Sequence, residues 1–145
     1  MATAETVELG PPHEPKEASI EAFKYLSLDI KKVLVHLRHT HNKHESKYFA
    51  AVSSLSDRDL VAFDESDLVL VRAGMSSYGL HLFGKLRLPK SDGGYIHVRM
   101  FVGGESENKV VKLHSIYNEE KELPDGSKTF RAILSKDDPL EWFDT

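Results

Sequence analysis

The sequence predicts a single α+β domain, in which one long amphipathic helix packs on a four- to five-stranded antiparallel sheet. Apolar residues recur at helical spacing between residues 19 and 43, and beyond Asp67 they recur at every second position in short segments. Glycine-rich turns separate these later segments, which is typical of an antiparallel meander. A chain of 145 residues needs no second domain to bury a core.

The first 17 residues are expected to form a flexible N-terminal arm, and residues 18–145 to form the domain. This segment contains Gly10-Pro11-Pro12 and Pro15 among charged residues, a composition that disfavours both helix and strand.

The predicted helix has Ser19 as its N-cap and ends between His39 and Lys43. Its inward face is expected to consist of Phe23, Leu26, Ile30, Val33, Leu34 and Leu37. We place Lys31, Lys32 and Arg38 on the solvent side or near the C-terminal end, where positive charge suits the helix dipole.

Two segments separate the helix from the meander. We interpret residues 48–55 as a strand in preference to a continuation of the helix. Residues 56–67 are predicted to be a polar connector with a short strand or an extra turn. Its carboxylates are expected to be solvated: Asp57, Asp59, Asp64, Glu65 and Asp67.

The meander is expected to contain strands over residues 80–88, 96–102, 109–117 and 128–134. In the first of these, leucines occupy one face, and the other face holds His81, Phe83, Lys85 and Arg87. Gly93-Gly94 and Gly103-Gly104 flank the second strand, and a Pro-Asp-Gly turn precedes the last.

Residues 135–145 hold the only tryptophan. Leu140, Trp142 and Phe143 are expected to cover the open edge of the core, because three large apolar side chains are rarely left in water. The alternative is a short linear motif that anchors a partner protein.

Composition excludes several classes of function. A formal net charge of -4 favours neither nucleic acid nor a membrane as a partner. Cysteine is absent, and the N-terminus lacks the apolar core of a signal peptide. We therefore expect a cytoplasmic or nuclear protein that is monomeric.

Histidines form the best candidate cluster for metal binding. His36, His39, His41 and His44 lie at helical spacing, but the sequence offers no third ligand for either neighbouring pair. A solvated helix end is the favoured interpretation, so no metal and no other cofactor is predicted. His97 and His114 are expected to face each other across adjacent strands in structural roles.

Within residues 70–118, the segment Leu70-Val71-Arg72-Ala73-Gly74 is followed by MSSYGLHLF, and residues 95–101 read YIHVRMF. This part of the chain resembles the cystatin superfamily, and within it the stefins, which carry Gln-x-Val-x-Gly where this chain has residues 70–74. YIHVRMF, residues 95–101, is similar to the stefin strand YIHLKVF, and the likeness continues to Asn118 without a gap.

The resemblance implies reversible inhibition of papain-like cysteine proteases by a wedge of three backbone segments, with no catalytic residue. The protease-binding residues it implies are Gly10 in the arm, Val71, Arg72, Ala73 and Gly74 in the first hairpin loop, and Gly103 and Gly104 in the second. Leu70 replaces the family's glutamine, and the second loop has no Pro-Trp or Leu-Pro-Gly. The charge of Arg72 predicts selectivity for a target that offers a carboxylate.

Two other functions stay open. A non-inhibitory cystatin-like module would bind a different protein through its sheet edge or its tail. The third hypothesis is a small α+β-cone enzyme or ligand-binding protein, although the usual nucleophile and phosphate-loop motifs are missing. Nuclear-transport-factor-like cones and profilin-like folds would show similar periodicity.

Overall fold

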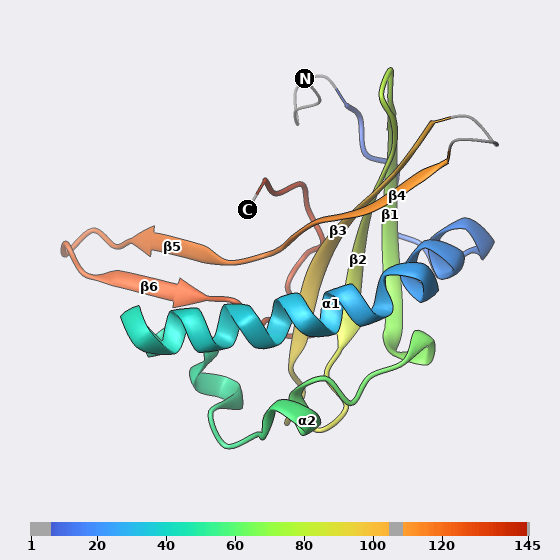
Figure 1. Cartoon of the computed structure of the whole chain (residues 1–145). Coiled ribbons are helices and arrows are strands. Elements are labelled where there is room, and N and C mark those ends of the chain that lie inside the picture. Colours follow the sequence, from blue (N-terminus) through green and yellow to red (C-terminus); the bar gives the residue numbers. More distant parts are fainter. Residues whose placement is uncertain (1–6, 105–108, 145) are drawn as a thin grey trace.

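A computed structural model describes residues 7–104 and 109–144. It confirms the α+β architecture, with helix α1 (Glu17–His44) lying across one face of a four-stranded antiparallel sheet in the order β1-β2-β3-β4 (Figure 1). These strands are β1 (Leu68–Ser76), β2 (Gly79–Arg87), β3 (Tyr95–Gly103) and β4 (Val110–Ile116). A separate two-stranded sheet pairs β5 (Glu119–Glu122) with β6 (Lys128–Arg131).

Helix α1 begins at Glu17, so the prediction of Ser19 as its N-cap is wrong. Ser19 lies in the first turn, where its Oγ accepts a hydrogen bond from the Lys16 amide at 3.0 Å and donates one to the Lys16 carbonyl at 2.8 Å. These bonds satisfy an amide that the helix itself leaves without a partner. The helix continues to His44, slightly beyond the predicted end.

The core lies between α1 and the sheet, as the helical spacing predicts. It brings together the buried residues Phe23, Leu26, Ile30 and Leu34 of α1 with Leu82, Ile96, Val98 and Met100 of the sheet. Val33 is wrongly predicted to face inward: it is 37% exposed because it lies about 100° around the helix from Leu34.

Arg38 lies toward the C-terminal end of α1, one of the two expected places, but it is buried and not on the solvent side. Its guanidinium donates to the carbonyls of Val52 and Leu55 and forms an ion pair with Asp57. The bonds hold the segment after α1 against the helix, and they offset the cost of burying the charge.

The segment predicted as a strand over residues 48–55 is instead the 3-10 helix η1 (Ser46–Val52). Phe49 and Val52 are both buried, and their spacing of three places them on one face of a 3-10 helix. The expected extra turn in the connector is present as α2 (Asp57–Leu60) and η2 (Glu65–Asp67). The prediction that Asp67 is solvated is wrong: its side chain is buried and pairs with Arg87 at 3.1 Å.

Residues 128–134 do not add a full strand to the main sheet as predicted. Strand β6 pairs with β5, a segment that was not expected to be a strand; β5 leads away from the main sheet and β6 returns toward it (Figure 1). After β6, Leu134 pairs with Tyr95 at the start of β3. His97 and His114 do not face each other either: a bulge shifts the β3–β4 register, and His97 lies beside Tyr117, whose amide donates to the His97 carbonyl.

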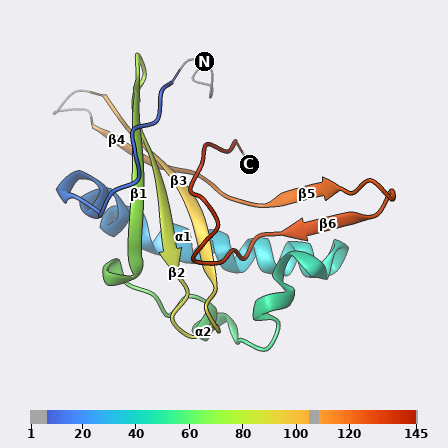
Figure 2. The ribbon, with the colours of Figure 1, turned by 180° about the vertical axis from the view of Figure 1, so that it is seen from behind.

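The two ends of the chain meet the sheet on its far side from α1 in different ways: the C-terminal segment crosses the face opposite α1, and the N-terminal segment runs along β1 (Figure 2). We call residues 7–16 the arm and residues 135–144 the tail. The arm is extended, but its described part is hydrogen-bonded to β1: the Gly10 amide donates to the Ala73 carbonyl at 2.8 Å, and His13 and Val71 exchange two bonds. The arm thereby covers the edge of β1, which would otherwise be open to pairing with another strand.

Candidate functional site

The predicted first hairpin loop is not a loop. Residues 71–74 lie in the middle of β1, where Val71 is fully buried, and the chain reverses only at Ser77 and Tyr78. The strand continues past residue 74 because β1 stays paired with β2 as far as Ser76. Gly79 then supplies the positive φ of 147° that the turn requires.

Two glycines let this turn lie close to the end of β3. Gly79 and Gly103 are direct partners across the β2–β3 pair. A Cβ on Gly79 would lie 2.5 Å from the Val102 carbonyl oxygen, and one on Gly103 would lie 2.5 Å from the Phe101 ring. Gly103 is therefore buried for packing reasons, whereas Gly104 is exposed.

We call this part of the molecule the hairpin end; it consists of residues 75–80 and 102–104. These residues line an open hollow of about 580 Å³. Met75 and Tyr78 are 67% and 58% exposed, so two large side chains project from the first turn. The hairpin end thus has exposed apolar side chains, and its two backbone segments lie close together at Gly79 and Gly103.

The arm approaches the hairpin end from the edge of β1. It runs antiparallel to β1, and a Cβ on Gly74 would lie 2.6 Å from a methyl carbon of Val7. Gly10 lies farther along β1, with its amide bonded to Ala73 and its carbonyl accepting from Arg72. Gly74 is consequently buried and Gly10 half-buried, and neither is the tip of a loop.

The contacts of Arg72 indicate a role different from the one predicted. Its Nε donates to the Gly10 carbonyl at 2.8 Å, and its Nη1 donates to the Leu140 carbonyl at 2.9 Å. Two backbone carbonyls of the protein thus hold the guanidinium without neutralising its charge, and the selectivity for a target with a carboxylate stays a prediction.

The tail packs on the sheet face opposite α1. Leu140 and Phe143 are buried against Phe83, and Trp142 is half-buried with its ring 4.4 Å from the Arg99 guanidinium. Leu140 and Phe143 are therefore closed to a partner as long as the tail stays on the sheet. The described tail covers a face of the sheet and not, as predicted, an open edge of the core.

Three cations from neighbouring strands hold the tail by its backbone, and we call them the cation row: Arg72, Lys85 and Arg99. Lys85 donates to the carbonyls of Lys136 and Asp138 at 2.8 and 2.5 Å, and Arg99 donates to the Phe143 carbonyl at 3.0 Å. Lys85 and Arg99 are only 4% and 3% exposed. Charged residues on the second face of central strands are a visible signal in the sequence. Apart from the Asp144 carboxylate, which lies 2.9 Å from the Arg99 Nη1, their partners in the tail are carbonyl groups, which no side-chain pattern reveals.

A polar pocket lies beside the tail and contains His97, Tyr117, Glu119, Arg131 and Asp138. His97 is 3% exposed and its Nε2 has no hydrogen-bond partner in the described structure. Burial, followed by the charge of Lys85, lowers the pKa of His97 to about 4, so the ring is neutral at pH 7. The Tyr117 hydroxyl donates to Glu119 at 2.6 Å, and burial raises its pKa. Sequence analysis missed this group because its members come from separate strands and from the tail.

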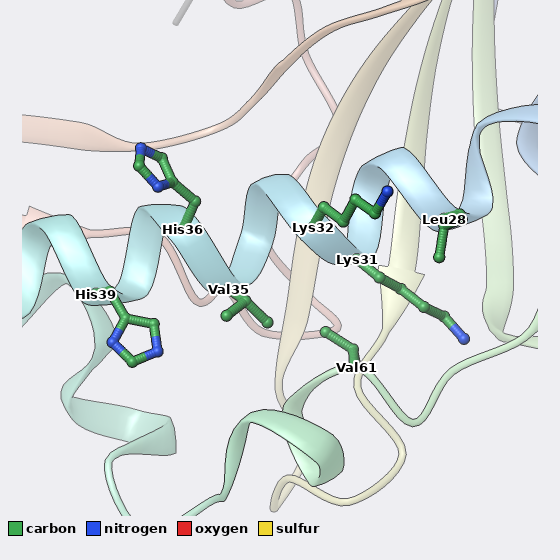
Figure 3. Close-up of a pocket in the computed structure, with 7 residues that line it drawn as sticks. All are labelled: Leu28, Lys31, Lys32, Val35, His36, His39 and Val61. Carbon is green, nitrogen blue, oxygen red and sulfur yellow. The ribbon is translucent and has the colours of Figure 1, made fainter.

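The histidine run is divided among different environments. Figure 3 shows the rings of His36 and His39 directed to different sides of α1, around a groove that Val35 and Val61 also line. His39 is bonded to Asp57 at 2.8 Å, and the His41 ring packs 4.0 Å from that of Tyr48. In the part of the chain that the structure describes, no three His, Cys, Asp or Glu side chains are placed to hold a metal ion.

The described ranges also contain no helix with both the length and the apolar character of a membrane span. The stefin resemblance rests on residues 70–118, and those residues build the hairpin end and the face that the tail covers. No family model, curated protein or solved structure matches the chain, so the proposals that follow rest on its own residues.

Proposed function

We propose that the protein is a reversible inhibitor of papain-like cysteine proteases that inserts its hairpin end into the active-site cleft. One observation carries this proposal: the arm, the β1–β2 turn and the start of the β3–β4 connection converge at the same end of the sheet (Figure 1). A cleft between two protease lobes accepts a narrow wedge of backbone, and such an inhibitor needs no catalytic group.

The residues that would enter the cleft differ from those first expected. Met75 and Tyr78 take the place of the buried Val71 and Gly74, because they are the exposed side chains of the first turn. Large apolar side chains at the centre of an interface supply most of its binding free energy. Gly104, which has a positive φ of 80° and is exposed, begins the second contact segment.

The test is a titration of a panel of papain-like proteases with the protein and with two variants. The double variant Met75→Asp/Tyr78→Asp should weaken inhibition at least about 100-fold, because two desolvated apolar contacts would be replaced by charges. The matched control is Leu28→Asp, since Leu28 is 62% exposed on α1 and lies outside the hairpin end. Gly74→Trp is a poor probe, because it would displace the arm from β1.

Equal inhibition by the double variant and the control would exclude the hairpin end as the inhibitory site. No inhibition of any protease at micromolar concentration would favour the second candidate, a non-inhibitory module that binds another protein through the same surface. The observation behind this candidate is the exposure of Met75 and Tyr78, which a non-protease partner would also cover.

A further inference from the structure

The two ends of the chain meet at one side chain on β1. Arg72 is half-buried, and its guanidinium donates one hydrogen bond to the arm, at Gly10, and another to the tail, at Leu140. A planar guanidinium presents its donors in fixed directions, so an acceptor held on one side orients the donor on the other side. The arm and the tail are therefore bound to β1 by a shared group.

A second contact joins the same two segments. Leu9 of the arm packs against the apolar cluster formed by Phe83, Leu140 and Phe143. The arm thus packs on a cluster to which the tail contributes Leu140 and Phe143. Removal of the tail would leave Leu9 with Phe83 alone of this cluster, and it would leave Arg72 with Gly10 as its only acceptor among these contacts.

The remaining attachments of the arm are few. Its described backbone is held by the bond from Gly10 to Ala73 and by the two bonds between His13 and Val71. Val7, which is nearest to the β1–β2 turn, is buried against the position of Gly74. A short edge segment with so few bonds opens readily unless side chains cover it.

From these contacts we infer that the docked tail fixes the arm through Arg72 and Leu9, so that Arg72 is a positioning residue for the hairpin end. The consequence for binding rests on the proposed function; the coupling between the tail and the arm does not. Release of the tail frees the arm, and the proposed wedge of arm and hairpin end then loses its arm.

Amide hydrogen exchange measured by NMR tests this coupling directly in the full chain. The variants are Arg72→Met, which removes the shared group, and Phe143→Ser, which loosens the tail without changing Arg72 or any residue of the arm itself. We expect the Gly10 and His13 amides to exchange about tenfold faster in both variants, while the core amides of Val98 and Met100 stay protected. Arg72→Lys, which keeps the charge but not the planar pair of donors, should give an intermediate rate.

Arg87→Met is the matched control, since Arg87 is a strand cation that contacts Asp67 and neither end of the chain. Release of the tail in Phe143→Ser is verified independently by a red shift of Trp142 fluorescence. Unchanged exchange at Gly10 and His13 despite a released tail would overturn the inference. Faster exchange in Arg87→Met as well would also overturn it, because the effect would then not depend on the shared group.

The two proposals fail separately. If the exchange rates change as expected and no protease is inhibited, the coupling stands and the protease assignment falls. If the protein does inhibit, Phe143→Ser should raise the inhibition constant about tenfold, although Phe143 lies in the tail and outside the hairpin end.

Discussion

The two faces of the main sheet are covered in different ways. On the helix face, Phe23, Leu26, Ile30 and Leu34 make a continuous apolar contact with the sheet, which needs no directional bonds. On the tail face, the cation row holds backbone carbonyls, and only a small apolar cluster accompanies it. A helix that is held by a large buried apolar area leaves the sheet only when the domain unfolds. A tail that is held by a few hydrogen bonds can open locally.

The helix face should show the largest response to a single substitution. Leu34 is fully buried, and Leu34→Ala should lower the free energy of unfolding by about 2–5 kcal/mol through lost contact and a residual cavity. Val33→Ala is the neighbouring control, and its cost should stay below about 1 kcal/mol because Val33 is 37% exposed. Urea denaturation measures both, and equal costs would mean that the core is not where the structure has it.

The tail face should instead respond to pH, through His97. Its pKa of about 4 lies below the value of 6.5 for an unperturbed histidine, so the unfolded chain binds the proton more tightly. The free energy of unfolding should therefore fall as pH drops from 6.5 to 4, by ~3 kcal/mol from this residue. The penalty should be absent above pH 6.5.

His97→Asn isolates that contribution, because other groups also titrate in this range. Wild type should lose more stability than the variant between pH 7 and pH 4, as measured by urea denaturation at each pH. The same substitution at the exposed His36 should leave the wild-type pH dependence in place. Parallel curves for wild type and His97→Asn would show that the imidazole is not buried.

The smallest effect expected here concerns the cation row itself. Lys85→Met keeps the length of the side chain but leaves the carbonyls of Lys136 and Asp138 without this donor. We expect a loss of about 1–3 kcal/mol, since removal of a buried charge also relieves a desolvation cost. Carboxypeptidase digestion should remove the tail faster while far-ultraviolet circular dichroism stays unchanged; coupled loss of both would mean that the two faces unfold together.

Regular periodicity accounts for what the sequence could predict. The helix and its main inward residues follow from apolar spacing, and the strands over residues 80–88 and 96–102 follow from alternation. Residues 48–55 were misassigned because Tyr48, Phe49 and Val52 fit a strand as well as a 3-10 helix, and only contacts with α1 and β6 decide between them. The burial of Arg38 and Asp67 could not be predicted because their partners are distant in sequence.

The candidate site was predicted less well than the fold. The resemblance placed a loop at residues 71–74, but strand pairing continues to Ser76, and the exposed turn falls at Ser77 and Tyr78. The role of Arg72 depends on two backbone carbonyls that lie 62 and 68 residues away along the chain. Carbonyl groups are common to every residue, so no side-chain pattern could identify these acceptors.

Those long separations also bear on the order in which the protein folds. Strands β1 to β4 pair only with sequence neighbours, so the meander forms by closing short loops. The hydrogen bonds of Arg72 close loops many times longer than those between the strands. The entropy lost in closing such loops is offset by contacts only when β1 is already in place. We therefore expect the arm and the tail to join a sheet that has already formed, which makes their meeting at Arg72 the last step of folding.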